Sequence, residues 1–455
     1  MTASADHGPG DGTDDGVAPR LLRVVGVAIG GPPPLRLRGW DGSEAGPADT
    51  PVLVLNHPRA LRRLLWSPDE LGLGRAWVSG DLDVEGDLYA AVSAVLDARS
   101  LAARGLDDGD RAGADPATGR PVPRPRAPRA RLLAEAARLG VLGPPPPPPP
   151  EEVRLRRGRP HTPGRDARAV RSHYDVGNDF YRLLLGPSWV YSCAYWDDGG
   201  DPAVEADLDR AQHDKLELVC TKLGLRPGMR LLDVGCGWGS MVMHAAREHG
   251  VRAVGVTVSP EQARLARDRV RQAGLERLVE IRQGDYREVA DGPYDAVSSI
   301  GMAEHVGRVR IAGYAARLHG LLAPGGRLLH HAIGSRGDTG LAARRRSFVE
   351  AYVFPDGELL PLAEPVTVLQ DAGVEIRDGH ALREHYALTL RAWVARLEAR
   401  WDAAVALVGP GRARVWRLYM AGSGVGFASG RVGVDQVLAV RLDAGRSGVP
   451  LRRPG

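Results

Sequence analysis

The chain has 455 residues, of which 43% are hydrophobic and 25% charged, and its formal net charge is +4. This composition is ordinary for a globular protein, and the length predicts two domains instead of one. No unbroken apolar segment approaches the ~20 residues that a membrane-spanning helix needs, so we expect any membrane contact to be made from the surface.

Cysteine and lysine are both scarce. The three cysteines, Cys193, Cys220 and Cys236, lack paired spacing, which predicts neither a disulfide framework nor a metal site and favours the reducing cytoplasm. The basic residues are nearly all arginine, with Lys215 and Lys222 as the exceptions. Arginine suits the phosphates of lipids or nucleic acid, although a general compositional bias toward Arg, Ala, Gly and Pro would produce the same excess.

The first part of the chain predicts a small domain after a disordered start. Residues 1–19 are acidic and rich in small residues, without the basic start and apolar core of a signal peptide, and we expect them to be disordered. Residues 20–106 predict an α+β domain, with lipid binding as its candidate role. The expected strands are 21–29 and 51–55, and the expected helices are 58–66 and 89–99.

Residues 107–168 predict a linker rich in Pro and Arg. Residues 144–150 are an unbroken proline run, which favours the stiff polyproline II conformation, and a short helix is expected at 132–139. The arginine-rich parts, 120–131 and 154–159, suit either a contact with an anionic lipid surface or an ordinary solvated linker.

From residue 169 to 455, predicted strands and helices alternate. This alternation predicts a doubly wound α/β fold, in which helices cover both faces of a parallel sheet and ligands bind beyond the carboxyl ends of the strands. The expected strands are 231–235, 254–259, 278–281, 294–300 and 327–331, the last after a turn at 323–326, and the expected helices include 207–223, 238–249 and one that begins at Pro260.

A glycine-rich turn follows the first of these strands, in the segment Leu-Leu-Asp-Val-Gly-Cys-Gly-Trp-Gly-Ser at residues 231–240. Gly235 and Gly237 can adopt backbone angles that other residues resist, and without a Cβ they let a ligand approach the main chain. The free N–H groups at the start of the next helix would face that ligand. The spacing Gly-x-Gly-x-Gly differs from the dinucleotide-binding fingerprint, and a purely structural turn is the alternative.

Five motifs in order give the chain a specific resemblance. They are His-Tyr-Asp-Val-Gly-Asn-Asp at 173–179, Tyr-Ser-Cys-Ala-Tyr-Trp at 191–196, Leu-Asp-Val-Gly-Cys-Gly-Trp-Gly at 232–239, Gly-Met-Ala-Glu-His-Val-Gly at 301–307 and His-Ala-Ile-Gly-Ser at 331–335. With these motifs, residues 169–442 resemble the cyclopropane-fatty-acyl-phospholipid synthase family, which includes the mycolic acid cyclopropane synthases. The resemblance implies a class I methyltransferase, with a Rossmann-like sheet and S-adenosylmethionine (SAM) as co-substrate.

The resemblance also implies a set of SAM-binding residues, two in the motif at 191–196 and the rest at the carboxyl ends of the first three strands. Asp233 has a simpler alternative, because an acidic side chain near a helix start is often only a favourable charge. The implied set is Tyr191, Ser192, Asp233, Gly235, Gly237, Gly239, Thr257, Gln262, Asp285 and Tyr286.

In this family the SAM methyl group is added to a cis double bond of an acyl chain, and a bound bicarbonate ion acts as the base. The implied bicarbonate ligands are Glu304, His331, Tyr386 and, through their backbones, Cys193 and Ile333. His173 and Tyr174 are the implied substrate-binding residues, and the faces of Tyr195, Tyr352 and Phe354 are candidates to stabilise a carbocation.

Several of these side chains have simpler alternatives. Glu304 and His305 would also suit a surface pair beside a turn, and His331 would suit a hydrogen-bonded core histidine, as we expect for His330 on the opposite face of the strand. Tyr386 would also suit plain packing. Cys193 has no neighbouring base, and methyl transfer from SAM needs no covalent enzyme intermediate, so we do not assign it as a nucleophile.

The sequence therefore predicts a cytoplasmic, peripherally membrane-associated methyltransferase that forms cyclopropane fatty acyl chains in phospholipids. The same methylation giving methylene- or methyl-branched chains is the first alternative, and a non-catalytic lipid-binding module is the second. We expect unsaturated phospholipid acyl chains as partners and consider a homodimer. No nucleic acid partner is expected, because the densest arginine clusters lie in the linker and not beside the SAM loops.

Overall fold

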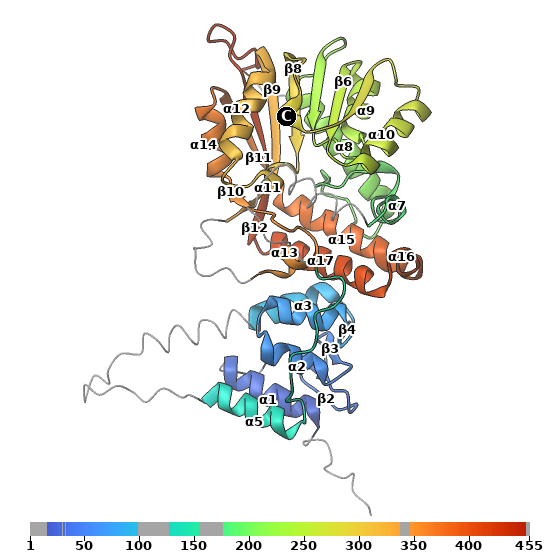
Figure 1. The fold of residues 1–455 in the computed structure, drawn as a ribbon, viewed down its shortest axis with the longest axis vertical. Coiled ribbons are helices and arrows are strands. Elements are labelled where there is room, and N and C mark those ends of the chain that lie inside the picture. Colours follow the sequence, from blue (N-terminus) through green and yellow to red (C-terminus); the bar gives the residue numbers. More distant parts are fainter. Residues whose placement is uncertain are drawn as a thin grey trace, which may run out of the picture. The chain divides into compact units, whose positions relative to one another are not determined.

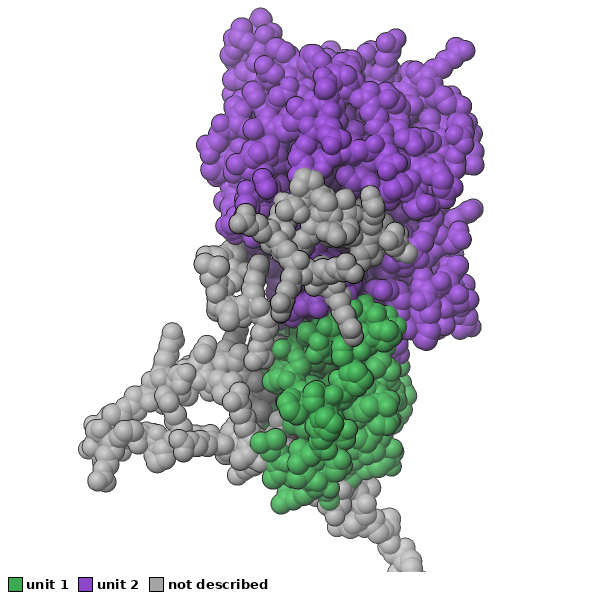
Figure 2. Space-filling view, viewed as in Figure 1, with its two compact units in different colours: residues 1–152 green, residues 153–455 purple. Residues whose placement is uncertain are grey.

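The computed structural model describes residues 16–29, 31, 33–98, 127–153, 176–336 and 346–451. The chain divides into two compact units, residues 1–152 and residues 153–455 (Figure 2). In the part of the chain that the structure describes, no helix is long and apolar enough to cross a membrane.

The N-terminal unit is built on a four-stranded sheet in the order β2-β1-β3-β4. The strands are β1 (Arg36–Arg38), β2 (Glu44–Ala45), β3 (Val52–Leu55) and β4 (Leu82–Glu85). The helices are α1 (Val17–Ile29), α2 (Arg59–Trp66), α3 (Glu70–Val78), residues 88–98 and α5 (Ala127–Arg138). This is the α+β arrangement predicted for the small domain.

Helix α1 corrects two expectations, because its residues were predicted to be a disordered start followed by a strand. Val17 and Ala18 are buried in the core of the unit, and Leu21 follows one turn later on the same face. The first two N–H groups of the helix donate to the side chains of Asp41 (2.9 Å) and Ser43 (3.0 Å). These capping groups lie far along the chain, so the helix start has no local signal in the sequence.

The segment predicted to be a linker, residues 107–168, also differs from that prediction where the structure describes it. Helix α5 packs against α1, and Leu139 packs against the core of the N-terminal unit. The proline run is held in place, because the guanidinium of Arg63 donates to the carbonyl of Pro147 (2.8 Å). Residues 127–152 therefore belong to the N-terminal unit and are not a free spacer. The arginine-rich segments 120–126 and 154–159 lie outside the described residues.

The C-terminal unit contains an eight-stranded sheet in the order β11-β12-β9-β8-β5-β6-β7, with β10 paired to β9 (Figure 1). Strands β5 to β9 are parallel, and β12 is antiparallel to both β9 and β11. The strands are β5 (Arg230–Val234), β6 (Arg252–Thr257), β7 (Val279–Gln283), β8 (Tyr294–Ile300), β9 (Leu322–Ser335), β10 (Leu360–Pro361), β11 (Glu375–Ala381) and β12 (Val432–Val440). The order reverses between β5 and β8, which is where doubly wound sheets bind ligands.

The turn predicted at 323–326 is part of β9. Leu322 pairs with Tyr294, and pairing with β8 resumes at Arg327 opposite Ala296, so the glycine-containing segment between them forms an irregularity within the strand. The proline and glycines correctly marked a break in regular pairing, although they do not separate the strand from the preceding helix.

Helices cover both faces of this sheet. On one face, α8 (Glu205–Leu223), α9 (Ser240–His249) and α10 (Pro260–Gln272) share a core with alternate residues of the strands. On the other face, α11 (Ala303–Val306), α12 (Ile311–Leu321) and α14 (Ala363–Asp371) form a second core. The remaining helices are α7 (Asn178–Leu185), α13 (Phe348–Tyr352), α15 (Arg383–Ala399), α16 (Trp401–Val408) and α17 (Pro410–Ala428), and Figure 1 shows α15 and α17 across one end of the sheet.

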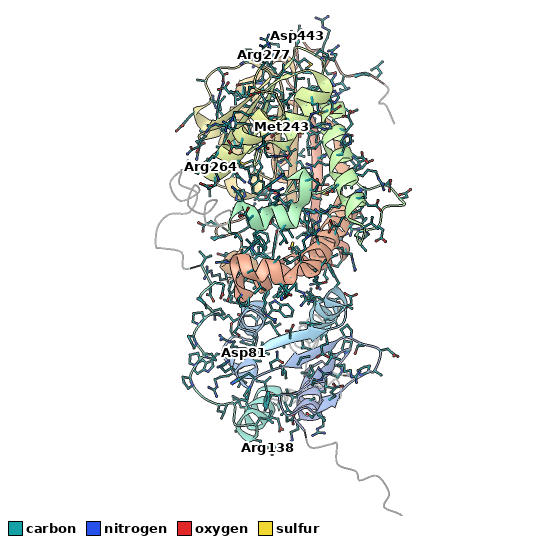
Figure 3. All side chains as sticks on the ribbon, turned by 90° about the vertical axis from the view of Figure 1, so that its right-hand side faces the viewer. Asp81, Arg138, Met243, Arg264, Arg277 and Asp443 are labelled. Atoms are coloured by element: carbon teal, nitrogen blue, oxygen red, sulfur yellow. The ribbon has the colours of Figure 1, made fainter. Side chains whose placement is uncertain are left out.

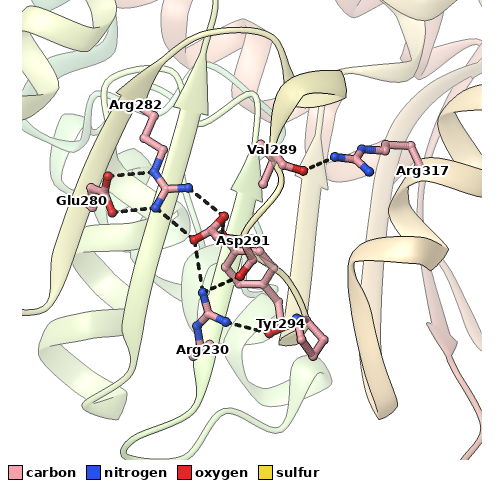
Figure 4. Close-up of polar contacts among 8 residues, drawn as sticks. Arg230, Glu280, Arg282, Val289, Asp291, Tyr294 and Arg317 are labelled. Atoms are coloured by element: carbon pink, nitrogen blue, oxygen red, sulfur yellow. Dashed lines mark hydrogen bonds and ion pairs between the residues drawn. The ribbon is translucent and has the colours of Figure 1, made fainter.

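A network of ion pairs joins β7 to the amino ends of β5 and β8 (Figure 4). The guanidinium of Arg282 contacts the carboxylates of Glu280 (2.7 Å) and Asp291 (2.8 Å), and Arg230 contacts Asp291 at 3.2 Å. The hydrogen bonds from Arg282 hold the pKa of Asp291 below its usual value. Each exposed ion pair contributes little to the free energy of folding by itself. The network as a whole holds the amino ends of β5 and β8 next to β7, away from the ligand-binding edge of the sheet.

Asp81 is the buried charge on which the N-terminal unit depends (Figure 3). Its carboxylate accepts hydrogen bonds from Arg59 (2.9 Å), Arg63 (3.1 Å) and Ser79 (2.9 Å). Burial alone would raise the pKa of Asp81, but these hydrogen bonds outweigh burial and lower it. The stabilisation is therefore present at neutral pH and is lost as the pH falls through the lowered pKa.

We expect Asp81→Asn to destabilise the N-terminal unit by about 3 kcal/mol, because it leaves the buried guanidinium of Arg63 without its counter-charge. Hydrogen exchange of α2 and α3, measured by mass spectrometry, checks this, with the C-terminal unit as internal reference. The exposed Asp49 offers a matched control, and Asp49→Asn should change the stability by less than about 0.5 kcal/mol. Equal exchange in the two variants would contradict the assignment.

Candidate active site

A cavity opens beyond the carboxyl ends of β5, β6, β7 and β8, and its empty volume, open mouth included, is about 1300 Å³. Nine of the ten residues predicted to bind SAM line this cavity. They are Tyr191, Ser192, Asp233, Gly235, Gly237, Thr257, Gln262, Asp285 and Tyr286.

The glycine turn shapes the floor of the cavity, since Gly235 and Gly237 both have positive φ angles (82° and 53°). A Cβ on Gly235 would lie 2.5 Å from the side chain of Met302, whereas a Cβ on Gly237 would meet nothing closer than 4.0 Å. Gly239 does not line the cavity, and its missing Cβ instead leaves room for Ala266 of α10. Gly239 therefore packs closely against α10, and its assignment to the SAM site stays a prediction.

The ends of β6 and β7 supply polar groups in fixed orientations. The hydroxyl of Thr257 donates to the side-chain oxygen of Gln262 (2.8 Å), and both residues are buried. This leaves the amide nitrogen of Gln262 for a ligand hydroxyl. Asp285 accepts from the backbone N–H (3.0 Å) and the side chain (2.8 Å) of Arg287, and these bonds help lower the pKa of Asp285 against the effect of burial.

Asp233 and Lys215 form a buried pair of opposite charges at this cavity. Burial raises the pKa of Asp233 to about 6, although the Ser298 hydroxyl donates to its carboxylate (2.7 Å). Burial also lowers the pKa of Lys215 to about 8, and its ammonium donates to the hydroxyl of Ser192 (3.1 Å). Lys215 was not assigned to the site from the sequence. The one sequence feature that could have pointed to it is the rarity of lysine in this chain.

Glu304 lies on the short helix α11, directly after the end of β8. Its Oε1 accepts from the backbone N–H of Ile333 (2.7 Å), and its buried Oε2 has no hydrogen-bond partner in the described part of the chain. Burial raises the pKa of Glu304 to about 7, so its carboxylate is poised to change charge near neutral pH. A surface pair with His305 is excluded, because burial also lowers the pKa of His305 to about 4.

His331 is nearly inaccessible, and among the described residues neither of its ring nitrogens has a hydrogen-bond partner. Burial and the charge of Lys215 keep its pKa well below the ordinary value, so the imidazole is neutral. Gln436 stands directly opposite on β12, and its buried amide also has no partner within the described segments. His330, by contrast, contacts the hydroxyl of Tyr314 (3.2 Å), in keeping with a core role.

Tyr419 lies near Glu304, and further tyrosines gather around Tyr191. Burial raises the pKa of Tyr419 to about 12, and the charge of Glu304 adds to this effect. Burial likewise raises the pKa of Tyr191 well above its ordinary value, and the neighbouring hydroxyls of Tyr419, Tyr181 and Tyr386 contribute. These hydroxyls are therefore close neighbours and remain protonated.

Cys193 is fully buried, and its thiol donates to the carbonyl of Ala194 (3.2 Å). Burial raises the pKa of this thiol, so it is neutral and unsuited to nucleophilic attack. The charge of Lys215 acts on both Cys193 and His331, which places all three in one neighbourhood.

Not every expected residue falls in this neighbourhood. His173 and Tyr174 lie outside the described residues, so their assignment stays a prediction. Among the aromatic candidates, the ring centroid of Phe354 lies 5.8 Å from those of Tyr419 and His305, so its role stays a prediction. The ring of Tyr352 packs on Phe348, and the ring of Tyr195 packs on His380 and His385.

The comparison with known proteins settles the class of this site. Residues 161–437 match the protein family described as mycolic acid cyclopropane synthetase. The chain belongs to this family. The expected family, the α/β class I methyltransferase fold and the enzyme class are confirmed, and the protein is a SAM-dependent methyltransferase.

Two relatives are similar over nearly the whole chain. One, named "Probable fatty acid methyltransferase", is from Mycobacterium tuberculosis and is 42% identical, covering 92% of this chain and 94% of its own. Another from the same organism, "Tuberculostearic acid methyltransferase", is 32% identical over 96% of this chain and 94% of its own. The cyclopropane-fatty-acyl-phospholipid synthase of Escherichia coli is 39% identical over 51% of this chain and 56% of its own.

Two solved structures are similar to this protein, each with a TM-score of 0.56. The similarity covers 60% of this chain and 97% of each solved chain. One is the cyclopropane synthase MmaA2 from Mycobacterium tuberculosis, at 31% identity. The other, at 33% identity, is the mycolic acid cyclopropane synthase CmaA1 complexed with SAH and CTAB. SAH is the product that SAM leaves after methyl transfer, which agrees with the cavity at the glycine turn.

We expect Gly237→Ala to weaken SAM binding by at least ~tenfold, because the new Cβ would project into the cavity. Titration calorimetry with SAM checks this. Gly239→Ala is a matched control: it imposes similar backbone strain (φ 82° against 53°) but lies outside the cavity, so its affinity should stay near that of the wild type. Equal losses in both variants would show that only the fold had been disturbed.

Proposed function

We propose that the protein transfers the methyl group of SAM to the cis double bond of an unsaturated fatty acyl chain, with a cyclopropane ring as the first candidate product. The observation that carries the proposal is a pair of buried groups, Glu304 and His331, whose polar atoms lack partners among the described residues beside the SAM cavity. The names of the relatives and the CTAB in one neighbour, a detergent with one long alkyl chain, support a lipid substrate.

An alkene is a weak nucleophile, so the site must act mainly by orientation, holding the sulfonium methyl in line with the double bond. Methyl transfer leaves a carbocation, which water would trap. The reaction therefore needs a dry channel and a group that accepts one proton.

Aromatic side chains supply the dry surroundings. The ring of Tyr191 lies 5.3 Å from that of Trp393, and the ring of Tyr386 lies 4.6 Å from that of Phe427. Tyr419 joins the same group and is close enough to Glu304 for its pKa to respond to the carboxylate. Aromatic faces exclude water and stabilise a nearby cation.

The buried donors and acceptors fit a small anion. Neutral His331 can donate one N–H, and the free Oε2 of Glu304 can accept a hydrogen bond from the O–H of the anion, while Tyr386 supplies a hydroxyl. In this site the Ile333 N–H fixes the Glu304 carboxylate, and Cys193 lies next to Lys215, which adds positive charge. A bicarbonate ion held by these residues would supply the proton acceptor. Gln436, which lies opposite His331, is a further candidate ligand of the bicarbonate ion.

A branched product is the second candidate, because relatives that match nearly the whole chain are named fatty acid and tuberculostearic acid methyltransferases. Ring closure and branching share the methylation. The ring forms when the new methyl group loses a proton at once, whereas a methylene branch forms when a hydride first shifts from the methyl-bearing carbon to the cationic carbon. We further propose that the protein meets its acyl chains at the surface of a phospholipid membrane.

Product analysis distinguishes these candidates. Vesicles containing unsaturated phospholipid are incubated with protein and methyl-labelled SAM, and the hydrolysed fatty acids are examined by mass spectrometry and NMR. We expect the label in a cyclopropane methylene, whereas label in a methyl or exomethylene branch would favour the second candidate. Absence of label together with absence of SAM binding would favour a non-catalytic lipid-binding module.

We expect Glu304→Gln to lower kcat by at least about 100-fold, with little change in SAM affinity, because the amide cannot accept a proton. Turnover and calorimetry on the same preparation check this. Glu358→Gln is the matched control, since the backbone N–H of Glu358 donates to the Glu304 carbonyl (3.0 Å) while its side chain serves Arg308. Unchanged turnover in Glu304→Gln would contradict the proposed role.

The pH dependence gives an independent check. Because burial raises the pKa of Glu304 to about 7, the carboxylate form is lost as the pH falls through this value. Wild-type kcat should therefore rise between about pH 6 and 8, while the residual kcat of Glu304→Gln should lack this rise. The same rise in both proteins would assign it to another group.

A further inference from the structure

Three potential metal ligands, Cys220, His244 and His249, converge between α8 and α9, apart from the SAM cavity, and the carboxylate of Glu217 contacts both histidines. We propose that Glu217, Cys220, His244 and His249 form a zinc site that joins these two helices. The ligand atoms of Cys220, His244 and His249 all lie within 4.8 Å of one another. The Oε2 atom of Glu217 lies 3.1 Å from Nε2 of His244 and 3.0 Å from Nε2 of His249.

The helix geometry explains this convergence. Glu217 and Cys220 are three positions apart on α8, which places them on one face of the helix. His244 lies near the middle of α9 and His249 is its last residue, and both have their Nε2 atoms within hydrogen-bond distance of the same carboxylate oxygen. The other oxygen of Glu217 accepts from the hydroxyl of Thr221 (3.4 Å), which leaves Oε2 as the inward-facing atom.

One thiolate, two imidazoles and one carboxylate are a ligand set that suits tetrahedral Zn²⁺. The charges also balance, because a thiolate and a carboxylate together offset the two positive charges of the ion. Binding requires donor atoms that lie within 4.8 Å of one another to close by up to about 1 Å and the thiol proton to be released.

The site has a route for the ion. Cys220 is fully buried and His244 nearly so, whereas the side chains of His249 and Glu217 are 19% and 42% exposed. An ion can therefore enter past Glu217 and reach the thiol. With all four positions filled by protein, the site is of the structural kind, and it would hold α8 against α9.

The test uses the full chain without a polyhistidine tag, exposed to ZnSO₄ and then passed over a chelating resin. We expect about one zinc per chain by elemental mass spectrometry. Co²⁺ added to metal-free protein should give the near-ultraviolet charge-transfer band of a Co–thiolate bond. Cys220→Ser should abolish this band, and His249→Ala should weaken zinc binding at least ~tenfold.

His319→Gln is the matched control, because His319 lies on α12, which covers the other face of the sheet, and it should bind zinc like the wild type. Circular dichroism and SAM binding establish that each variant is folded. The proposal is overturned if wild-type protein retains no zinc, or if folded Cys220→Ser retains the same zinc and the same band. In that case the cluster is a hydrogen-bonded network in which Glu217 accepts from both histidines.

Discussion

The active site depends on polar groups kept away from water. Asp233, Lys215, His331 and Glu304 are all buried, and burial is the largest influence on the pKa of each of them. As a result, an acid and a base that would be fully charged in water are brought toward neutral pH, and the histidine stays neutral. The proposed reaction passes through a carbocation, and the same exclusion of water that shifts these pKa values would protect that cation.

The sheet offsets the energetic cost of burying these polar groups by holding each of them in a fixed position. Asp233 pairs with Ser298 across β5 and β8, and His331 pairs with Gln436 across β9 and β12. Because directly opposite residues share a face, these side chains form a polar row on the α8 side of otherwise apolar strands. The neighbouring residue His330 points to the other face, where it meets Tyr314. Successive residues of one strand therefore place His330 and His331 on opposite faces of the sheet.

Much of this could be predicted from the sequence, because the signals were local. The strands of the C-terminal sheet follow apolar runs, and the glycine turn lies in one continuous motif, so β8 was predicted to the residue. Helix α1 was predicted as a strand, because its β-branched residues favoured one and its capping groups, Asp41 and Ser43, lie beyond a turn. Lys215, Tyr419 and Gln436 were missed for the same reason, since only the folded chain brings them to the site.

Helix α8 shows how one element can serve two sites. Gln212, Lys215 and Lys222 lie along one stripe and contact Ser192 and His380 on the active-site side. Glu217 and Cys220 lie along the stripe that faces α9, whose first residues follow the glycine turn. The cysteine spacing predicted no metal site, yet spacing within one segment says nothing about ligands shared between two helices. Any contact that fixes α8 against α9 also fixes Lys215 relative to the turn that binds the co-substrate, so packing on the outer side of the helix bears directly on the chemistry at the inner side.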